Sequence, residues 1–166
     1  MANSNAISRI KNKLIKEMIK DMEIVAAIDS RTVPASKSEQ LKGTHIFDFH
    51  QAPDTIKDVE TFITIQVHIP DTYRRTDGTF VNPVLEIWII SHERHMTVDN
   101  VPKVIENRND YISELLDRKF NGRNGFGIGD MTLVSNIEGT YQQDYLYRKM
   151  TFRITDLNDS LCDVDD

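Results

Sequence analysis

Apolar residues recur every three or four positions in two parts of the chain, which is the pattern of an amphipathic helix. The first part covers residues 5–29, with lysines and acids mostly on its other side. The second begins near Asn100 and Pro102, since proline fits a first helical turn, and ends at Asn121-Gly122. We predict two helices that each pack one apolar stripe on a sheet. The apolar positions of the first are Ile7, Ile10, Leu14, Ile15, Met18, Ile19, Met22 and Val25.

Alternating apolar and polar residues predict the strands. These fall at 45–50, 59–69, 80–90, 131–136 and 145–154, and polar stretches at 30–44, 71–79 and 136–144 are expected to be loops. The second and third strands should form an antiparallel hairpin, because Asp77-Gly78 between them is a turn signal. The order helix, strands, helix, strands predicts one α+β domain over residues 1–154. In it, two helices flank a mostly antiparallel sheet.

Charge is unevenly distributed along the chain. The 166 residues carry a formal net charge of −6, from 26 acids and 20 bases. Residues 155–166 hold five of the acids and no base, so 26 − 5 leaves 21 acids against 20 bases elsewhere. A nearly neutral body does not favour binding to nucleic acid through a strongly basic surface. The acidic segment 155–166 is expected to be flexible or to dock on a partner.

Targeting and redox signals are few. Cys162 is the sole cysteine, so no intrachain disulfide is possible. Charges interrupt the N-terminal stretch, which therefore lacks the apolar core of a signal peptide. No apolar run approaches the roughly 18 residues of a membrane span. We expect a soluble protein that is made and assembled inside a cell.

Four of the seven glycines lie within residues 120–130. A phosphate-binding glycine loop leads from a strand into a helix N-terminus, whose N–H groups hold the anion. Here a helix leads into the glycines and a strand follows, so the order is reversed. We therefore predict a connector, in which Gly122 ends the helix and Gly125, Gly127 and Gly129 turn the chain into the next strand.

Candidate catalytic residues are sparse. His92 and His95 are two residues apart, which is narrower than the spacing that places two metal ligands on one helix face. On a turn they converge, and Asp48 and His50 are further candidate ligands, which leaves a small metal-dependent hydrolase as an alternative. We assign no catalytic residue, cofactor or metal, and expect a non-enzymatic role. Glu86 is expected to pair with Arg148 or Lys149 of a neighbouring strand.

Two features favour assembly with other chains. Trp88 and Ile90 lie on the second face of the 80–90 strand, which indicates a central strand or an edge covered by a neighbouring subunit. Tyrosine, tryptophan and arginine are favoured at protein contacts, and the connection at 71–79 contains three such residues. The glycine connector is expected to sit at an end of the sheet, where contact with a neighbour would reorder it. The candidate interface residues are Tyr73, Arg74, Arg75, Trp88, Gly125 and Gly127.

Four stretches of the chain resemble the tail-terminator proteins of tailed bacteriophages, which are also called tail-completion or neck proteins. They are FVNPVLEIWIISHERHMTVD (80–99), VPKVIENRNDYISELLDRKFNG (101–122), GIGDMTLVSNIEG (127–139) and YLYRKMTFRITDLND (145–159). In that family a first helix precedes a sheet, a second helix follows, and the last strand is basic and aromatic. Residues 45–70 are longer here than in the small members of the family.

The resemblance implies a structural protein of the virion neck. Such proteins form a ring, commonly a hexamer, at the top of the tail tube, where they stop tail growth. The implied partners are other copies of the chain, the connector or stopper protein, and the tail tube protein. Genomic DNA would pass through the ring without sequence-specific binding, and no membrane is involved. The implied location is the neck or tail of the virion, after assembly in the host cytoplasm. The alternatives are another head–tail connector ring protein, or the hydrolase using His92 and His95.

Overall fold

The computed structural model describes residues 4–50, 59–70, 72–75, 78–126 and 128–157. Its helical elements are α1 (Ser4–Lys20), α2 (Met22–Ile28), the 3-10 helices η1 (Ala35–Leu41) and η3 (Glu93–His95), and α3 (Arg108–Phe120). Its strands are β1 (Ile46–Phe47), β2 (Thr61–His68), β3 (Thr72–Arg75), β4 (Gly78–Val81), β5 (Val84–His92), β6 (Ile128–Gln142) and β7 (Tyr145–Leu157). The fold is α+β, as predicted.

The seven strands form one sheet whose order is β1-β2-β5-β7-β4-β3, with β6 paired to β7. All pairings are antiparallel except that of β1 with β2. The predicted antiparallel pairing is confirmed, because β2 and β5 pair from Thr61↔Ser91 to His68↔Val84. The predicted simple connection is wrong, because β3 and β4 lie between these strands in the chain, and Gly78 of the expected turn begins β4. Strand β7 lies at the centre and pairs along its length with both β5 and β6.

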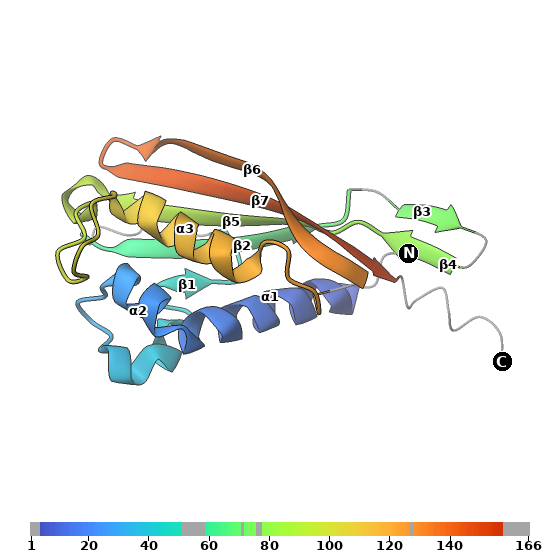
Figure 1. The fold of residues 1–166 in the computed structure, drawn as a ribbon, viewed down its shortest axis with the longest axis horizontal. Coiled ribbons are helices and arrows are strands. Elements are labelled where there is room, and N and C mark those ends of the chain that lie inside the picture. The colour runs from blue at the N-terminus through green and yellow to red at the C-terminus, as the bar shows by residue number, and fades with distance from the viewer. Residues whose placement is uncertain (1–3, 51–58, 71, 76–77, 127, 158–166) are drawn as a thin grey trace.

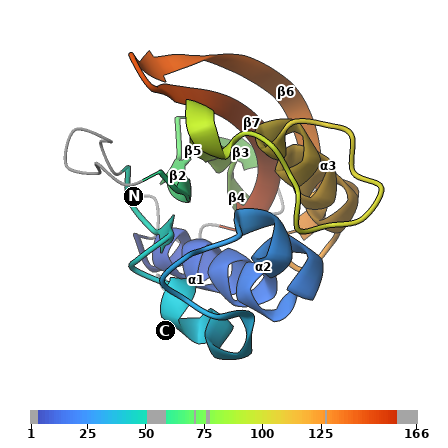
Figure 2. The same ribbon diagram turned by 90° about the vertical axis from the view of Figure 1, so that its left-hand side faces the viewer.

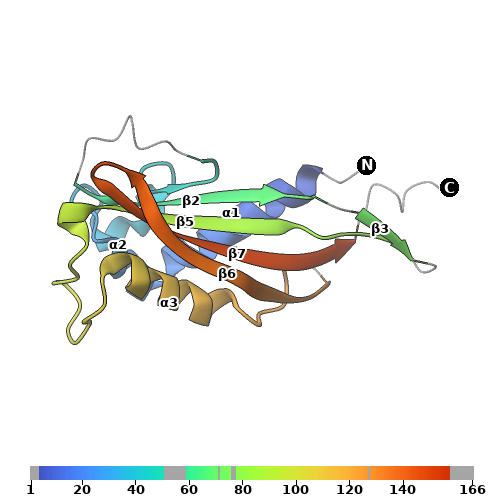
Figure 3. The same ribbon diagram turned by 90° about the horizontal axis from the view of Figure 1, so that it is seen from above.

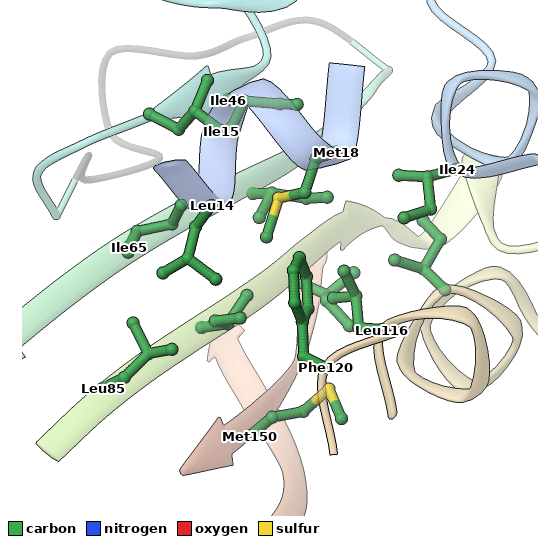
Figure 4. Close-up of a cluster of buried hydrophobic side chains, with 14 of the residues drawn as sticks. Leu14, Ile15, Met18, Ile24, Ile46, Ile65, Leu85, Leu116, Phe120 and Met150 are labelled. Atoms are coloured by element: carbon green, nitrogen blue, oxygen red, sulfur yellow. The ribbon is translucent and has the colours of Figure 1, made fainter. Parts of the chain in front are cut away.

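The helices α1, α2 and α3 cover one face of this sheet (Figures 1 and 2). The core lies between the two layers, and most residues of the predicted helix stripes belong to it (Figure 4). Met22 is an exception, because its side chain is 54% exposed. Leu14 and Met18 from α1 and Leu116 and Phe120 from α3 are completely buried. They pack on the alternate residues of the strands that point toward the helices, which are Ile63, Ile65, Val67, Leu85, Ile87, Ile89, Met150, Phe152 and Ile154.

The opposite face of the sheet is turned toward the viewer in Figure 3, where α1 and α2 lie behind the strands and α3 lies along one side. Among the described residues, no helix lies over this face. We call it the outer face. It carries Trp88 and Ile90 of β5, as the alternation predicted, and Tyr147 and Lys149 of β7, which pair with them across the ladder.

The predicted helix over residues 5–29 is two helices, so that expectation was wrong. Asp21 adopts an extended backbone between α1 and α2, and its side chain accepts from the N–H groups of Glu23 and Ile24. Asp21 therefore caps the start of α2, which a purely periodic reading of the apolar residues cannot detect. The stretch 30–44 also contains η1, with Leu41 buried, where a loop was expected.

The second predicted helix begins later than expected, at Arg108 rather than near Pro102. Asn107 is its N-cap, since its side-chain oxygen accepts from the N–H of Asp110 at 3.0 Å. Residues 101–107 are irregular, and Ile105 is 92% exposed instead of joining the apolar stripe. The helix ends as predicted, because Gly122 has a φ of 72°, in the left-handed region that glycine favours.

Two predicted loops contain strands. The connection at 71–79 holds β3 and the start of β4, and the expected strand at 80–90 is divided between β4 and β5, with Pro83 in the gap. The stretch 136–144 continues β6 to Gln142, so that β6 and β7 form a long hairpin. The last strand extends to Leu157, three residues beyond the predicted domain limit at 154.

Candidate functional site

An aromatic cluster lies on the outer face of the sheet. Its buried members are Phe47, Phe62, Ile90 and Tyr145, and Trp88, Tyr141 and Tyr147 pack against them half-buried. They come from β2, β5, β6, β7 and the segment around β1. We call this group the outer cluster. It is a second hydrophobic centre, separated from the main core by the sheet itself.

Trp88 lies at the middle of the outer cluster. Its ring centroid is 4.9 Å from that of Tyr147 and 5.3 Å from that of His50. Lys149 Nζ lies over the same indole, 5.1 Å from its centroid, and also pairs with Glu86 at 3.3 Å. Of the two predicted partners of Glu86, Lys149 is the one that bonds it. The charge pair and the cation–π contact hold Lys149 against the cluster.

Three buried polar atoms of this face have no hydrogen-bond partner among the described residues. They are Trp88 Nε1, His50 Nδ1 and Thr64 Oγ1, and Thr64 stands directly opposite Trp88 in the ladder. A buried donor or acceptor without a partner costs about 1–3 kcal/mol, so such atoms are uncommon in folded proteins. All three atoms are buried inside the outer cluster, so they are unsatisfied groups of the fold itself rather than contacts offered to solvent.

Gly139 of β6 makes room for the outer cluster. It stands opposite Tyr147 in the ladder, and a Cβ atom on it would lie 2.7 Å from the Tyr147 hydroxyl and 2.8 Å from the ring. The aromatic ring thus packs directly on the glycine backbone. The sequence reading placed this glycine in a loop and missed the role, although a glycine between alternating apolar residues signals a close approach in a strand.

The other candidate interface residues are spread over two regions. Tyr73, Arg74 and Arg75 lie on β3, whose hairpin with β4 extends beyond the helices (Figure 1). The conformations of these three side chains are outside the described part of the chain. Gly125 precedes β6 with a φ of 89°, and its carbonyl accepts from Lys13 Nζ of α1. Gly127 lies outside the described residues.

The histidines proposed as metal ligands have separate partners. His92 Nδ1 accepts from the N–H of Arg94, and His95 Nδ1 bonds the hydroxyl of Thr61 at 2.9 Å. His50 Nε2 bonds the hydroxyl of Tyr141 at 2.8 Å. Within the part of the chain that the structure describes, no group of three or more histidine, cysteine or acidic residues could hold a metal ion.

A buried polar network connects the helices to the sheet, and the sequence reading missed it. Ser91 donates to Asn109 Oδ1 at 2.7 Å, and Thr61 Oγ1 is 2.8 Å from Ser91 Oγ. The only hydroxyl proton of Ser91 is donated to Asn109, so Ser91 Oγ accepts from the Thr61 hydroxyl. Thr61 Oγ1 in turn accepts from His95, whose Nδ1 therefore carries a proton. The two hydroxyls of this network, of Thr61 and Ser91, are buried, and each already bonds two partners. The network therefore orders the fold and offers no nucleophile.

The neutral form of His95 is favoured by its surroundings. Burial lowers the pKa of His95, and the Arg108 guanidinium lowers it further, against the opposing charges of Asp29 and Glu60. His95 Nε2 lies 3.5 Å from Asp29 Oδ2 but is not aligned for a hydrogen bond. The distance alone would favour a charged ion pair. Burial decides the outcome, because the ring is only 5% exposed.

Arg108 is the largest fully buried polar side chain, at 1% exposure. Its guanidinium donates to the carbonyls of His95, Ala27 and Thr97 at 2.5–2.6 Å and lies 3.3 Å from Asp29 Oδ2. It therefore joins α2, α3 and the segment after η3. The spacing of apolar residues does not reveal this role, because the alignment of three carbonyls toward one point is a tertiary feature.

A second buried pair joins β1 and β2. His45 Nε2 and Glu60 Oε2 are 2.6 Å apart, and His45 stacks on Phe62 with ring centroids 5.5 Å apart. Glu60 also accepts from the N–H of Arg31. These contacts fix the short parallel strand β1 beside β2 and so position Phe47 in the outer cluster.

None of the helices in the described part of the chain is long and apolar enough to cross a membrane. No curated protein matches the chain. The YomW family matches residues 11–154. Since this match covers most of the 166 residues, the chain belongs to the YomW family, which is of phage type.

Proposed function

We propose that this chain is a structural component of the phage neck, a ring-forming tail terminator. It would cap the tail tube and join it to the head-side connector, while genomic DNA passes through the ring. Its partners would be other copies of itself, in a hexameric ring, together with the connector or stopper protein and the tail tube protein. Its place would be the virion, after assembly in the host cytoplasm.

The outer face is the observation that carries this proposal. A sheet that is covered by helices on one side normally exposes polar residues on the other. Here the outer side holds aromatic side chains that are only half-buried, Trp88, Tyr141 and Tyr147, and Ile137 of β6 is 47% exposed beside them. Aromatic residues surrounded by polar atoms are typical of protein contacts.

Two further features agree with a ring. The β3–β4 hairpin extends from one end of the body and is held there by the pairing of β4 with the end of β7. Such an arm can reach a neighbouring copy. The body of the chain is also nearly neutral, with 21 acids and 20 bases outside the acidic segment 155–166. A nearly neutral ring would let DNA slide through without holding it.

The experiment that tests the proposal is disruption of the gene in its phage. Loss of a tail terminator should give tails of uncontrolled length that do not join heads, and the purified protein should restore joining in a lysate. Cryo-electron microscopy of intact virions should place the chain in a ring at the neck. Particles with normal, attached tails in the absence of the chain would overturn the proposal. A ring elsewhere in the neck would identify it as another connector protein.

A further inference from the structure

A groove lies between the C-terminal half of α1 and η1, on the side of the molecule away from the outer face. Its volume is about 540 Å³. The apolar side chains of Ile15, Ile19 and Met22 line it, and Met22 is 54% exposed although it is a large hydrophobic residue. An exposed methionine beside buried isoleucine is typical of a surface that receives an apolar side chain.

The charges that surround this groove are mostly positive. Lys16, Lys20 and Lys42 line it with Glu39, so three positive charges and one negative charge leave a balance of 3 − 1 = +2. Lys42 Nζ is held by the side chain of Asn12 at 3.0 Å. The groove therefore fits a segment that combines apolar residues with acids.

The end of this chain has that composition. Residues 158–166 contain Leu161 and Val164 among four aspartates, with no base. We propose that residues 158–166 of a second copy of this chain dock in the groove, with leucine and valine against Met22 and the aspartates against the lysines. This inference rests on the proposed function in one respect, since both require copies of the chain to associate.

Chain length favours a second copy over the same copy. Strand β7, which ends at Leu157, stops close to the N-terminal end of α1 (Figures 1 and 3). The groove is lined by residues of the other half of that helix, from Asn12 to Lys20. Ile15 to Ile19 lie roughly 17–22 Å along α1 from Ser4, at 1.5 Å per residue. Leu161 and Val164 follow Leu157 by four and seven residues, so even a fully extended chain carries them only about 13 and 23 Å from it. Within one copy, Leu161 would stop short of the groove, and the two apolar side chains could not both occupy it.

The natural cysteine makes a direct test possible. One full-length form of the chain carries Met22→Cys together with Cys162→Ser, and the other form is unaltered and differs in size through a tag. When the two forms are mixed and gently oxidised, we expect a disulfide between the new cysteine of one copy and Cys162 of the other. Lys16→Glu with Lys20→Glu in the first form should reduce the yield several-fold, as should high salt.

The matched control carries Val134→Cys with Cys162→Ser, because Val134 is 47% exposed on β6, away from the groove. A yield no higher than that of this control would overturn the inference. A further variant carries Met22→Cys and keeps its own Cys162. If this variant forms the disulfide only within one copy, the inference would also be overturned. Cross-linking in solution by a chain that is absent from virion necks would overturn the proposed function alone. A neck ring without this cross-link would overturn the docking alone.

Discussion

At the scale of single residues, the polar side chains inside this fold decide more than its apolar ones. Arg108 and His95 are both almost completely buried, and both bond main-chain or side-chain groups from several elements. The burial of the apolar core residues could be predicted from their spacing along the chain. The burial of Arg108 and His95 could not be predicted, because their partners are distant in sequence and belong to several elements.

Replacing Arg108 with alanine should strongly destabilise the protein. Three buried carbonyl groups and Asp29 would lose the guanidinium that donates to them. Removing one partner of a buried charged interaction typically lowers the free energy of unfolding by about 3–5 kcal/mol. Chemical denaturation would measure the change in the free energy of unfolding. Arg118→Ala is the control, because Arg118 also lies on α3 and pairs with Glu23, but both side chains are at least 60% exposed. Its effect should stay below about 1 kcal/mol.

The protein should lose stability on acidification through His95. The folded state holds the His95 pKa below its ordinary value of 6.5, so below that pH the unfolded chain binds a proton that the folded one resists. Stability should therefore be complete above about pH 6.5 and fall as the pH decreases toward the lowered pKa. Urea denaturation between pH 5 and 8 would measure the free energy of unfolding as a function of pH. His95→Gln should flatten this part of the profile, and an unchanged slope would contradict the assignment.

At the scale of elements, the sequence predicted which faces are apolar but misplaced several boundaries. The stripes of both helices, apart from the exposed Met22 and Ile105, and the alternation of β2, β5 and β7 were right, because burial on one side leaves a regular period in the residues. The break at Asp21 and the late start of α3 depend on single capping side chains. The continuation of β6 depends on pairing with β7, which gives polar residues such as Asn136 and Glu138 a place in a strand.

Nor did the sequence reveal the site as a whole. It placed Trp88 correctly on the second face of its strand. It could not bring Phe47 and His50 together with Tyr141, which lies about 90 residues further along the chain and meets them only when β1 and the β6–β7 hairpin are in place. Period-2 alternation shows which face a residue occupies, but not what stands beside it.

The junction between α1 and α2 gives a test at this scale. Asp21 caps α2 and also bonds Lys119 Nζ of α3 at 2.8 Å. Burial raises the pKa of Asp21, but Lys119 and the two capping N–H groups outweigh this, and the net pKa is lowered. Asp21→Ala should lose both contacts, and a lost cap alone costs about 1 kcal/mol. Asp21→Asn should keep the cap and show a smaller loss by thermal unfolding. Equal losses would mean that the cap contributes nothing.

At the scale of the whole molecule, the two faces of the sheet serve different purposes. The inner face is closed by three helices and holds the fold together. The outer face carries the outer cluster and, beside it, the exposed apolar side chain of Ile137, which buries little area in the free chain. An exposed side chain there can therefore be changed without unfolding the chain.

Ile137→Glu should block assembly while leaving the monomer folded. Ile137 stands opposite Lys149 on the outer face and is 47% exposed, so a carboxylate is tolerated in the free chain but would be buried in a contact. Ile105→Glu is the matched control, at a position that is 92% exposed in the segment before α3. Native mass spectrometry would count the copies, and circular dichroism would verify folding. Assembly by both variants alike would exclude this face from the contact.

The separation of the groove from the end of β7 gives the proposed contact a direction. A copy that offers its last residues at one end and receives those of a neighbour at the other joins unlike surfaces, and such heterologous contacts close into a ring only when the rotation between copies divides a full circle. A chain shortened at Leu157 would keep the groove but lack the segment that docks in a neighbour's groove. When shortened and full-length copies are mixed, each shortened copy should interrupt the ring, so that a minority of shortened copies leaves most rings incomplete.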